Sequence, residues 1–234
     1  MSFFSKKSPL LLLLLGLLAL AACSEESRKQ RQVEARARQG LPAVEVAQAA
    51  AEENLSPGAQ LYRDKTCNTC HGDDGIKPLL PTYPIIAKQG EAYALKQMRD
   101  IKSGARSNGQ SAAMKPIVDQ VTDEELVILA KFIAEELGAD KTYGGDGGEG
   151  MPGETLYKTK TCVACHGADA KTPLLPEYAK LAGQNAQYVK QQLMDVKSGA
   201  RDNGAAIAGM KGIMPLVSEE EMDQLAEYIA ALPR

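Results

Sequence analysis

Residues 66–72 read TCNTCHG, and residues 161–167 read TCVACHG. These two short stretches hold four of the five cysteines and both histidines of the 234-residue chain. A cysteine pair separated by two residues is typical of four kinds of site: a disulfide, half of a zinc site, a redox-active dithiol, or an attachment point for haem. The surroundings of the two motifs decide between these alternatives.

The two motifs occupy equivalent positions in an internal repeat. At an offset of 95 or 96 residues, three pairs of segments align: LYRDKTCNTCHG (61–72) with LYKTKTCVACHG (156–167), DIKSGARSNG (100–109) with DVKSGARDNG (195–204), and MKPIVDQVTDEEL (114–126) with MKGIMPLVSEEEM (210–222). Two copies that span most of the chain predict two domains of one fold, at residues 56–137 and 153–234. The copy number is too small for a solenoid.

The segments outside the repeat are connectors. Residues 138–152 are rich in glycine, which predicts a flexible or loosely packed linker. Residues 23–55 are charged and rich in alanine and have no repeat partner. We expect them to form a tether, helical in part, that leads to the first domain.

Each copy has the pattern of helices, and no stretch alternates for long in the manner of a strand. Long runs without proline predict helices at residues 90–103 and 185–198. Ser56 and Pro57 resemble the start of a first helix. Two capping boxes predict the start of the last helix in each copy: Thr122 with Glu125, and Ser218 with Glu221. The sequence therefore predicts an all-α fold.

The pattern Cys-x-x-Cys-His favours covalent haem over the other three kinds of site. A zinc site would need further cysteine or histidine ligands, and neither copy contains any. A disulfide across two residues closes too small a loop to add much stability, and a redox dithiol expects a βαβ context. We therefore predict two haem c groups, bound through four cysteines: Cys67, Cys70, Cys162 and Cys165.

Composition agrees with a large buried cofactor. Aromatic residues make up only 5% of the chain, and tryptophan is absent. Haem would replace the missing volume, whereas a core of Leu, Ile, Val, Ala and Tyr alone is the alternative.

The axial ligands of the iron follow from the same motifs. His71 and His166 directly follow the cysteine pairs, and they are the only histidines, so neither domain can supply a second imidazole. Lys, Met or an open site remain for the opposite position. Met114 and Met210 align in the repeat and give the His/Met ligation usual in cytochromes c. Met214 aligns with a valine, so we interpret it as a packing residue.

The N-terminus predicts export. Lys6 and Lys7 precede an apolar run at residues 10–22 that is too short to cross a membrane, so residues 1–22 are interpreted as a signal peptide. The run ends Leu-Ala-Ala-Cys23, which resembles the lipobox of bacterial lipoproteins and predicts lipidation at Cys23 and anchoring in the periplasm. An ordinary signal peptide with a nearby cysteine is the alternative.

Charge limits the class of partner. Without the two N-terminal lysines the chain has 25 basic and 30 acidic residues, a net charge of −5. A mildly acidic exported protein is a poor candidate for binding nucleic acid.

Residues 56–234 resemble the di-haem cytochromes of the cytochrome c4 group. The resemblance rests on the two haem motifs, on LAGQNAQYVKQQLMDVKSGAR (181–201), and on the SEEE and LAEYI segments near the C-terminus. It implies two class I cytochrome c domains related by a pseudo-twofold axis, with facing haem edges. It also implies that Arg106 and Arg201 pair with haem propionates, although solvated loop arginines are the alternative.

The chain departs from the family pattern at two places. Copy one reads Ile-Ala-Lys-Gln at residues 86–89, where the family tends to have Leu-Ala-Gly-Gln. The family proline whose carbonyl accepts a hydrogen bond from the ligating histidine is matched by Pro84, whereas copy two has Ala179. Since this bond tunes the iron, the departure leaves both alternatives open: equal potentials at the two haems, or different ones.

The function predicted from these residues is electron transfer without a substrate at the iron. The resemblance implies an electron carrier that delivers to a terminal oxidase. Together with the lipobox, it predicts a membrane-tethered periplasmic carrier in a respiratory chain, which takes electrons from a quinol-oxidising complex or another donor and passes them to a terminal oxidase or reductase. Lysines near the motifs are candidate docking residues: Lys65, Lys77, Lys160 and Lys171. A di-haem enzyme such as a peroxidase, or a fixed cytochrome subunit of a larger membrane complex, is the alternative.

Overall fold

The computed structural model describes residues 55–234, with the side chains of 205 and 206 excepted, together with Arg31 and Ala35. The predicted signal peptide 1–22, Cys23 and nearly all of the tether 23–55 lie outside the described residues. Within the described part, no helix combines the length and apolarity needed to span a membrane.

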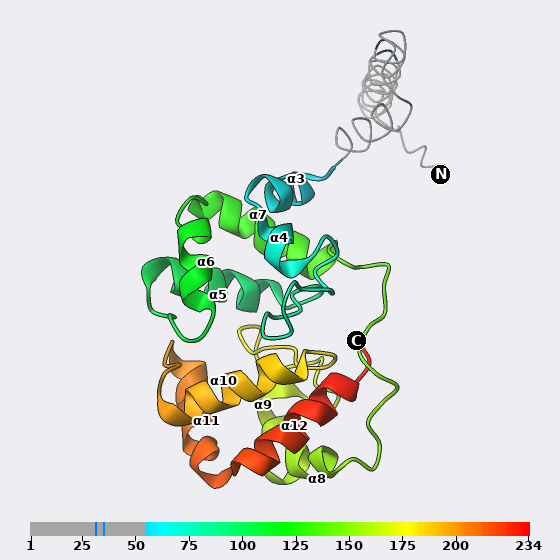
Figure 1. The fold of residues 1–234 in the computed structure, drawn as a ribbon, viewed down its shortest axis with the longest axis vertical. Helices are drawn as coiled ribbons and strands as arrows, with labels where there is room; N and C mark the ends of the chain where they lie inside the picture. Colours follow the sequence, from blue (N-terminus) through cyan, green and yellow to red (C-terminus); the bar gives the residue numbers. More distant parts are fainter. Residues whose placement is uncertain (1–30, 32–34, 36–54) are drawn as a thin grey trace, which may run out of the picture. The chain divides into compact units, whose positions relative to one another are not determined.

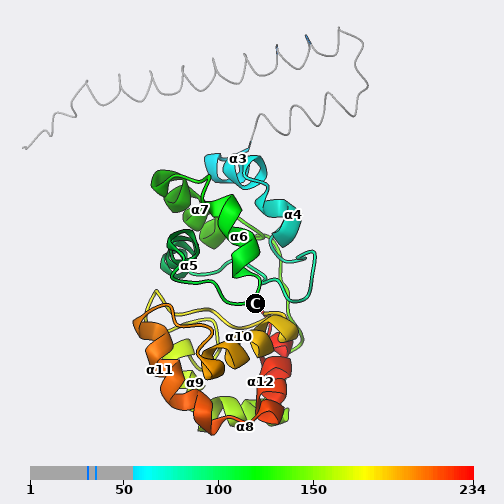
Figure 2. The ribbon, with the colours of Figure 1, turned by 60° about the vertical axis from the view of Figure 1, so that its left-hand side comes forward.

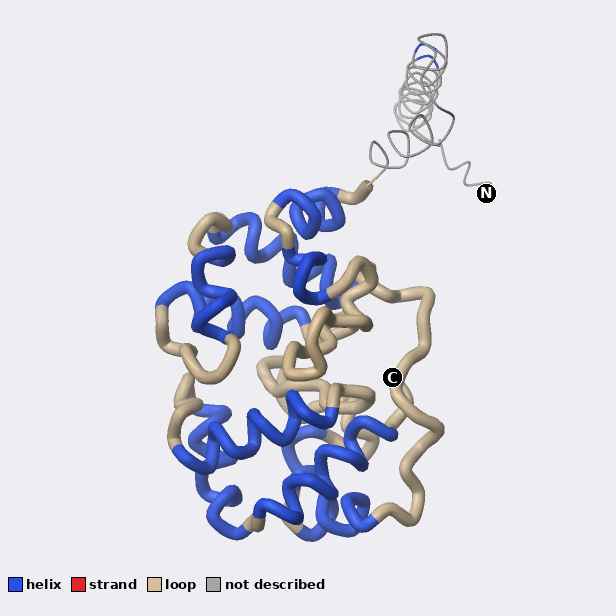
Figure 3. Tube along the Cα trace, viewed as in Figure 1, coloured by secondary structure: helices blue, strands red, loops and turns tan. Residues whose placement is uncertain are grey.

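The described residues from 55 onward form helices and loops without a strand, as Figure 3 shows, which confirms the all-α prediction. The first half contains five helices: α3 (Pro57–Asp64), α4 (Cys67–His71), α5 (Glu91–Ser103), α6 (Ser111–Val118) and α7 (Asp123–Glu135). The second half repeats the order: α8 (Pro152–Thr159), α9 (Cys162–His166), α10 (Ala186–Ser198), α11 (Ala205–Ile213), the short 3₁₀ helix η1 (Met214–Leu216) and α12 (Glu219–Ala231).

The helix starts follow the local signals in the sequence. The Ser56 hydroxyl accepts a hydrogen bond from the Ala59 amide, which caps α3. Both predicted capping boxes form at the start of α7 and α12, where the threonine or serine and the glutamate bond each other's backbone amides. Each box satisfies two amides that have no partner inside the helix.

Each half has its own hydrophobic core, built from the same elements (Figure 1). The first helix of each half crosses the last, so that α3 packs on α7 and α8 on α12. A tilted ring pair lies at each crossing: Tyr62 with Phe132 at 5.6 Å, and Tyr157 with Tyr228 at 5.7 Å between centroids. Separate cores with equivalent elements identify two domains of one fold.

The glycine-rich segment between the domains differs from the expectation of loose packing. Tyr143 and Arg234 exchange backbone hydrogen bonds of 3.1 and 2.7 Å, and the Gly147 amide donates to the Ala231 carbonyl at 3.0 Å. A Cβ atom at Gly144 would lie 2.2 Å from the Leu232 carbonyl oxygen. Glycine is needed here because the backbone lies directly against the end of the chain, and not because the segment is free.

The two domains meet through loops that follow the cysteine motifs (Figures 1 and 2). The Gln184 amide bonds both the N–H and the C=O of Ile85, at 2.7 and 2.8 Å. Gln89 does the same to Lys180, at 2.8 and 3.0 Å. This reciprocal exchange follows the pseudo-twofold relation of the repeat, and residues 56–234 form one compact unit.

Candidate haem sites

Each cysteine motif forms a helix of little more than one turn. Cys67, Cys70 and His71 lie at positions i, i+3 and i+4 of α4, so their side chains emerge on one face. Thr66, in the left-handed region with φ 57°, reverses the chain just before this helix, and Thr161 does the same before α9 with φ 63°. The spacing of the motif thus serves to aim two sulfur atoms and one imidazole in the same direction.

Backbone carbonyls orient both imidazoles. The Nδ1 atom of His71 lies 3.3 Å from the Pro84 carbonyl oxygen, and that of His166 lies 2.9 Å from the Ala179 oxygen. A carbonyl only accepts, so Nδ1–H donates and Nε2 keeps its lone pair. Burial lowers the pKa of both histidines, which keeps the rings neutral. Neutral imidazole with a free Nε2 is the form that binds a metal.

Each imidazole borders an apolar cavity. The cavity in the first domain has a volume of about 320 Å³ and is lined by both cysteines of the first motif, His71 and Met114. A second cavity, of about 290 Å³, spans the domain interface; it is lined by Cys162, Cys165, His166 and Met210 of the second domain and also by Cys67, His71 and Met114 of the first. The predicted attachment and ligand residues of each domain therefore converge on one cavity.

The methionines differ in their surroundings. Met114 and Met210 are both half-buried and line the cavities from α6 and α11. Met214 also lines the second cavity, but it is 3% exposed and belongs to the buried core. Val118, which aligns with Met214, is buried to the same degree. The equivalent environments support the pairing of Met114 with Met210.

The cysteines have the properties of attachment residues rather than of reactive thiolates. The four cysteines of the described residues form no disulfide. Burial raises the pKa of Cys67 and Cys162 to about 11, whereas thiolate ligands and redox dithiols need a lowered pKa. Among the described residues, no cluster of His, Cys, Asp or Glu could hold a metal by itself. An apolar cavity with paired sulfurs and a neutral imidazole fits a haem c group.

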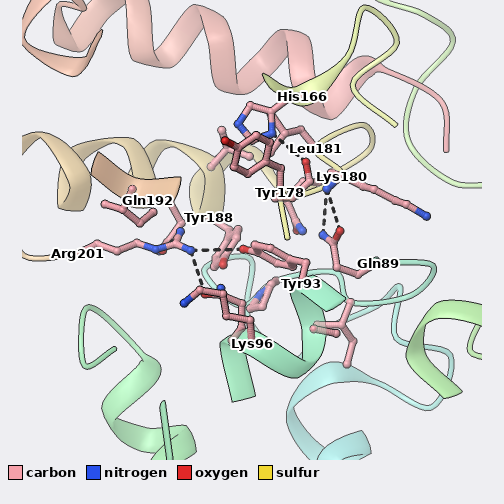
Figure 4. A pocket seen from close by; sticks show the side chains of 18 of the residues that line it. Gln89, Tyr93, Lys96, His166, Tyr178, Lys180, Leu181, Tyr188, Gln192 and Arg201 are labelled. Atoms are coloured by element: carbon pink, nitrogen blue, oxygen red, sulfur yellow. Dashed lines mark hydrogen bonds between the residues drawn. The ribbon is translucent and has the colours of Figure 1, made fainter. Parts of the chain in front are cut away.

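Arg106 and Arg201 lie at the domain interface and are both buried. The Arg106 guanidinium donates to Asn108, Gln97, Tyr188 and Gln192 at 2.9–3.2 Å, which uses all but one of its five donors. Arg201 mirrors these bonds toward Asn203, Gln192, Tyr93 and Gln97 (Figure 4). Neither arginine is a solvated loop residue.

Sequence reasoning missed the partners of these arginines. The missed residues are identical in the two copies: Tyr93 and Tyr188, Gln97 and Gln192, Asp100 and Asp195, Asn108 and Asn203. Identity of polar residues across the repeat was the available signal, because a pseudo-twofold interface requires the same side chains from both domains.

Two of the candidate docking lysines have a structural partner. Lys65 forms an ion pair with Glu125 at 3.0 Å, and Lys160 forms one with Glu221 at 2.9 Å. Both glutamates belong to the capping boxes of α7 and α12. These lysines therefore connect the segment before each cysteine motif to the start of the last helix.

Comparison with known proteins gives a consistent result. The family model for cytochrome c matches residues 151–233, and the model for subunit III of cbb3-type cytochrome c oxidase matches residues 53–133. Cytochrome c4 of Azotobacter vinelandii is 32% identical over 180 residues, which cover 71% of this chain and 84% of that protein. The thiosulfate dehydrogenase electron acceptor of Stutzerimonas stutzeri is 33% identical over 172 residues, or 70% and 77% of the two chains.

A solved structure agrees with these relatives. The crystal structure of reduced recombinant cytochrome c4 from Pseudomonas stutzeri superimposes with a TM-score of 0.63 at 29% identity. The match covers 76% of this chain and 98% of that one. Two class I cytochrome c domains in tandem are thus the architecture of the chain.

Proposed function

The chain belongs to the cytochrome c4 family of di-haem electron-transfer proteins, and from this premise we propose that it carries electrons between redox partners in the bacterial periplasm. The protein has two covalently bound haem c groups. The observation that supports the proposal best is the convergence of cysteine, histidine and methionine side chains on two apolar cavities.

The proposed attachment residues are the four motif cysteines, which would bind haem through thioethers. His71 and Met114 would hold the first iron, and His166 and Met210 the second. When bound, each iron supplies a one-electron couple, and methionine ligation raises its potential. The chain's own part is to keep each imidazole neutral and oriented, to surround the cavity with apolar side chains and to exclude water.

Arg106 and Arg201 line the cavities, and each keeps one guanidinium donor beyond the interface bonds. We assign this donor to a haem propionate. Two buried arginines at the interface would compensate the negative charge that propionates bring there.

The proposal extends to location and partners. Residues 1–22 would direct export, Cys23 would carry the lipid, and residues 23–55 would tether the domains at 56–137 and 153–234, which residues 138–152 connect. The donor would be a quinol-oxidising complex or, as the relative that accepts electrons from thiosulfate dehydrogenase suggests, a periplasmic dehydrogenase. The acceptor would be a terminal oxidase or reductase. A Cys23→Ser variant that stays with the membrane fraction would contradict the anchor.

The experiment that tests the carrier function is the replacement of each methionine. Oxidised haem with methionine ligation has a weak far-red absorption band. Met114→Ala and Met210→Ala should each remove half of this band and lower one potential, because each removes one thioether ligand. Met214→Ala is the matched control from the same cavity and should leave the band intact.

Two outcomes would contradict the proposal. A larger effect of Met214→Ala than of Met210→Ala would show that Met214, and not Met210, binds the second iron. A native oxidised protein with a high-spin haem that reacts rapidly with peroxide would indicate a di-haem enzyme in place of a carrier.

A further inference from the structure

We propose that Lys96, a residue of the first domain, raises the potential of the haem in the second domain relative to the first by placing an unmatched positive charge at its site. The inference rests on the proposed function of two haems that exchange electrons. It concerns one break in the repeat symmetry of the polar network at the interface.

The polar network between the domains is nearly symmetric. Asn203 donates to the Asp100 carboxylate at 2.7 Å, and Asn108 donates to Asp195 at 2.6 Å. The arginines, glutamines and tyrosines of the interface are equally paired. Each domain thus contributes one arginine and one aspartate, and these charges balance.

Position 96 and its equivalent, 191, break this symmetry. The Lys96 ammonium bonds the Asp100 carboxylate and donates to the Asn203 carbonyl of the second domain at 2.9 Å. The equivalent residue, Gln191, is neutral and donates to Asp195 at 2.7 Å. The network therefore has three positive and two negative side chains, and the surplus charge comes from the first domain alone.

The two residues line different cavities. Lys96 lines the cavity that spans the interface, close to Tyr93 and beside the network around Arg201 (Figure 4), and its ammonium reaches the Asn203 carbonyl of the second domain. Gln191 lines the cavity of the first domain. The bond to the Asn203 carbonyl places the charge of Lys96 against the second domain, whereas Gln191 brings no charge to the first.

A positive charge beside a redox centre favours its reduced form, because reduction adds one electron. The lysine side chain is 31% exposed and its partner Asp100 17%, so solvent screens their field less than at a free surface. Asp100 weakens the effect without cancelling it, since Asp195 has the same role opposite a neutral glutamine. The expected result is a second haem that is easier to reduce than it would be with glutamine at position 96.

Other features also distinguish the two sites and stay constant when Lys96 changes. Glu177 and Lys180 line the second cavity, where the first domain has Thr82 and Ile85. The histidine hydrogen bonds differ as well, at 3.3 and 2.9 Å. The proposal therefore concerns the change in potential that Lys96 causes, and not the absolute order of the two haems.

The test is a spectroelectrochemical titration of the complete di-haem protein and of four variants. The two haems are distinguished by their paramagnetically shifted methyl resonances, assigned through Met114→Ala and Met210→Ala. Lys96→Gln makes the interface symmetric and should lower the second potential. The equilibrium constant for electron exchange between the haems should change about tenfold, which is ~59 mV for a one-electron couple. Lys96→Arg keeps the charge and should preserve the difference.

The reciprocal variants complete the design. Gln191→Lys should raise the potential of the first haem, and the double exchange of Lys96→Gln with Gln191→Lys should move the effect from the second haem to the first. Thermal unfolding of each variant reports separately on the bond between Lys96 and the Asn203 carbonyl. A lower melting temperature with unchanged potentials would mean that Lys96 stabilises the contact between the domains and does not affect the haem potential.

The proposal is overturned if Lys96→Gln leaves the exchange constant within a factor of two, or if Lys96→Arg changes it as much as Lys96→Gln does. Either result would come from a protein with two intact His/Met haems, so it is distinct from failure of the carrier function. That failure would appear in the native protein as a missing far-red band before any variant is made.

Discussion

The two domains share their fold and interface but differ in the helix that carries the proposed methionine ligand. In the first domain α6 contains Ala113 before the methionine and Pro116 after it. In the second, α11 has glycine at the equivalent positions 209 and 212 and is followed by η1. Glycine in a helix interior costs about 1 kcal/mol relative to alanine. Proline in a helix interior costs about 3 kcal/mol, so α6 is weakened by Pro116 and α11 by its two glycines. The repeat thus preserves the attachment of the cofactor, while the helices that hold the opposite ligand differ in composition.

A second comparison, between equivalent loop residues of the two domains, shows that the backbone conformation is kept where the residue type changes. Gly75 and Ala170 are equivalent and both left-handed, with φ 69° and 55°. Lys88 and Gly183 are also equivalent, with φ 56° and 68°. Each domain therefore has glycine at one of these positions and a strained residue at the other. The packing around the loops imposes the conformation, and it does so whether or not glycine is present.

The largest expected effect comes from a substitution at the crossing of the first and last helices, which both domains share. A Cβ atom at Gly153 would lie 2.1 Å from the Gln224 carbonyl oxygen of α12, and one at Gly58 would lie 2.3 Å from Cβ of Phe132. Gly153→Ala should lower the free energy of unfolding by about 3 kcal/mol, because α12 must shift as a unit. Gly58→Ala should cost a similar amount, since the Cβ atom of Phe132 moves only with the backbone of α7.

Urea denaturation of both variants measures these losses of stability. Gly209, whose Cβ position has no neighbour within 4 Å, supplies the control site. Equal stability of Gly153→Ala and the native protein would show that α8 and α12 can separate without loss, contrary to the packing described.

The next effect concerns the reciprocal glutamines of the interface. Gln184→Ala would leave the buried N–H and C=O of Ile85 without a partner, and an unsatisfied buried group costs about 1–3 kcal/mol. We expect a loss of about 2 kcal/mol. Gln89→Ala should cost about half as much, because Lys180 is half-buried and water can replace the amide there.

Equilibrium unfolding followed separately at each haem tests this asymmetry. Gln184→Ala should also reduce the cooperativity between the domains, since Ile85 and Gln184 belong to different domains. If the two variants lose the same free energy, solvent reaches both contacts equally and the difference in burial has no energetic consequence.

Much of the fold could be predicted from the sequence because its signals are local. The capping residues, the proline at the start of α3 and the long helices α5 and α10 each depend on neighbours within one or two turns. The pairing of Met114 with Met210 came from the repeat, which supplies a second observation of every position. Family resemblance supplied the arginines, but not what they bond to.

The missed features depend on contacts between distant segments. Glycine in residues 138–152 predicted loose packing, but at Gly144 the glycine permits the backbone to lie against Leu232. The same residue type serves both purposes, and sequence spacing does not distinguish them. Likewise, Gln184 has a role only because Ile85, 99 residues away, offers its backbone.

The smallest expected effect concerns α6 and α11, the helices that carry the proposed methionine ligands. Gly209 is exposed in α11, directly before Met210, and a Cβ atom there meets nothing within 4 Å. Gly209→Ala should therefore stabilise the helix by about 1 kcal/mol without a clash. Ala113, the equivalent residue in α6, is also exposed, so Ala113→Gly is the matched variant that weakens the first ligand helix by the same amount.

Helix strength should appear in how readily an added ligand displaces each methionine. Titration of the oxidised protein with imidazole, followed by loss of the far-red band, measures this displacement at each haem. Gly209→Ala should weaken imidazole binding at the second haem about fivefold, which corresponds to ~1 kcal/mol, because more helix must be disrupted to release Met210. Ala113→Gly should strengthen binding at the first haem by a similar factor. Imidazole affinities that neither substitution changes would mean that the iron bond and the surrounding core hold the methionines and that the glycines of α11 have no part in it.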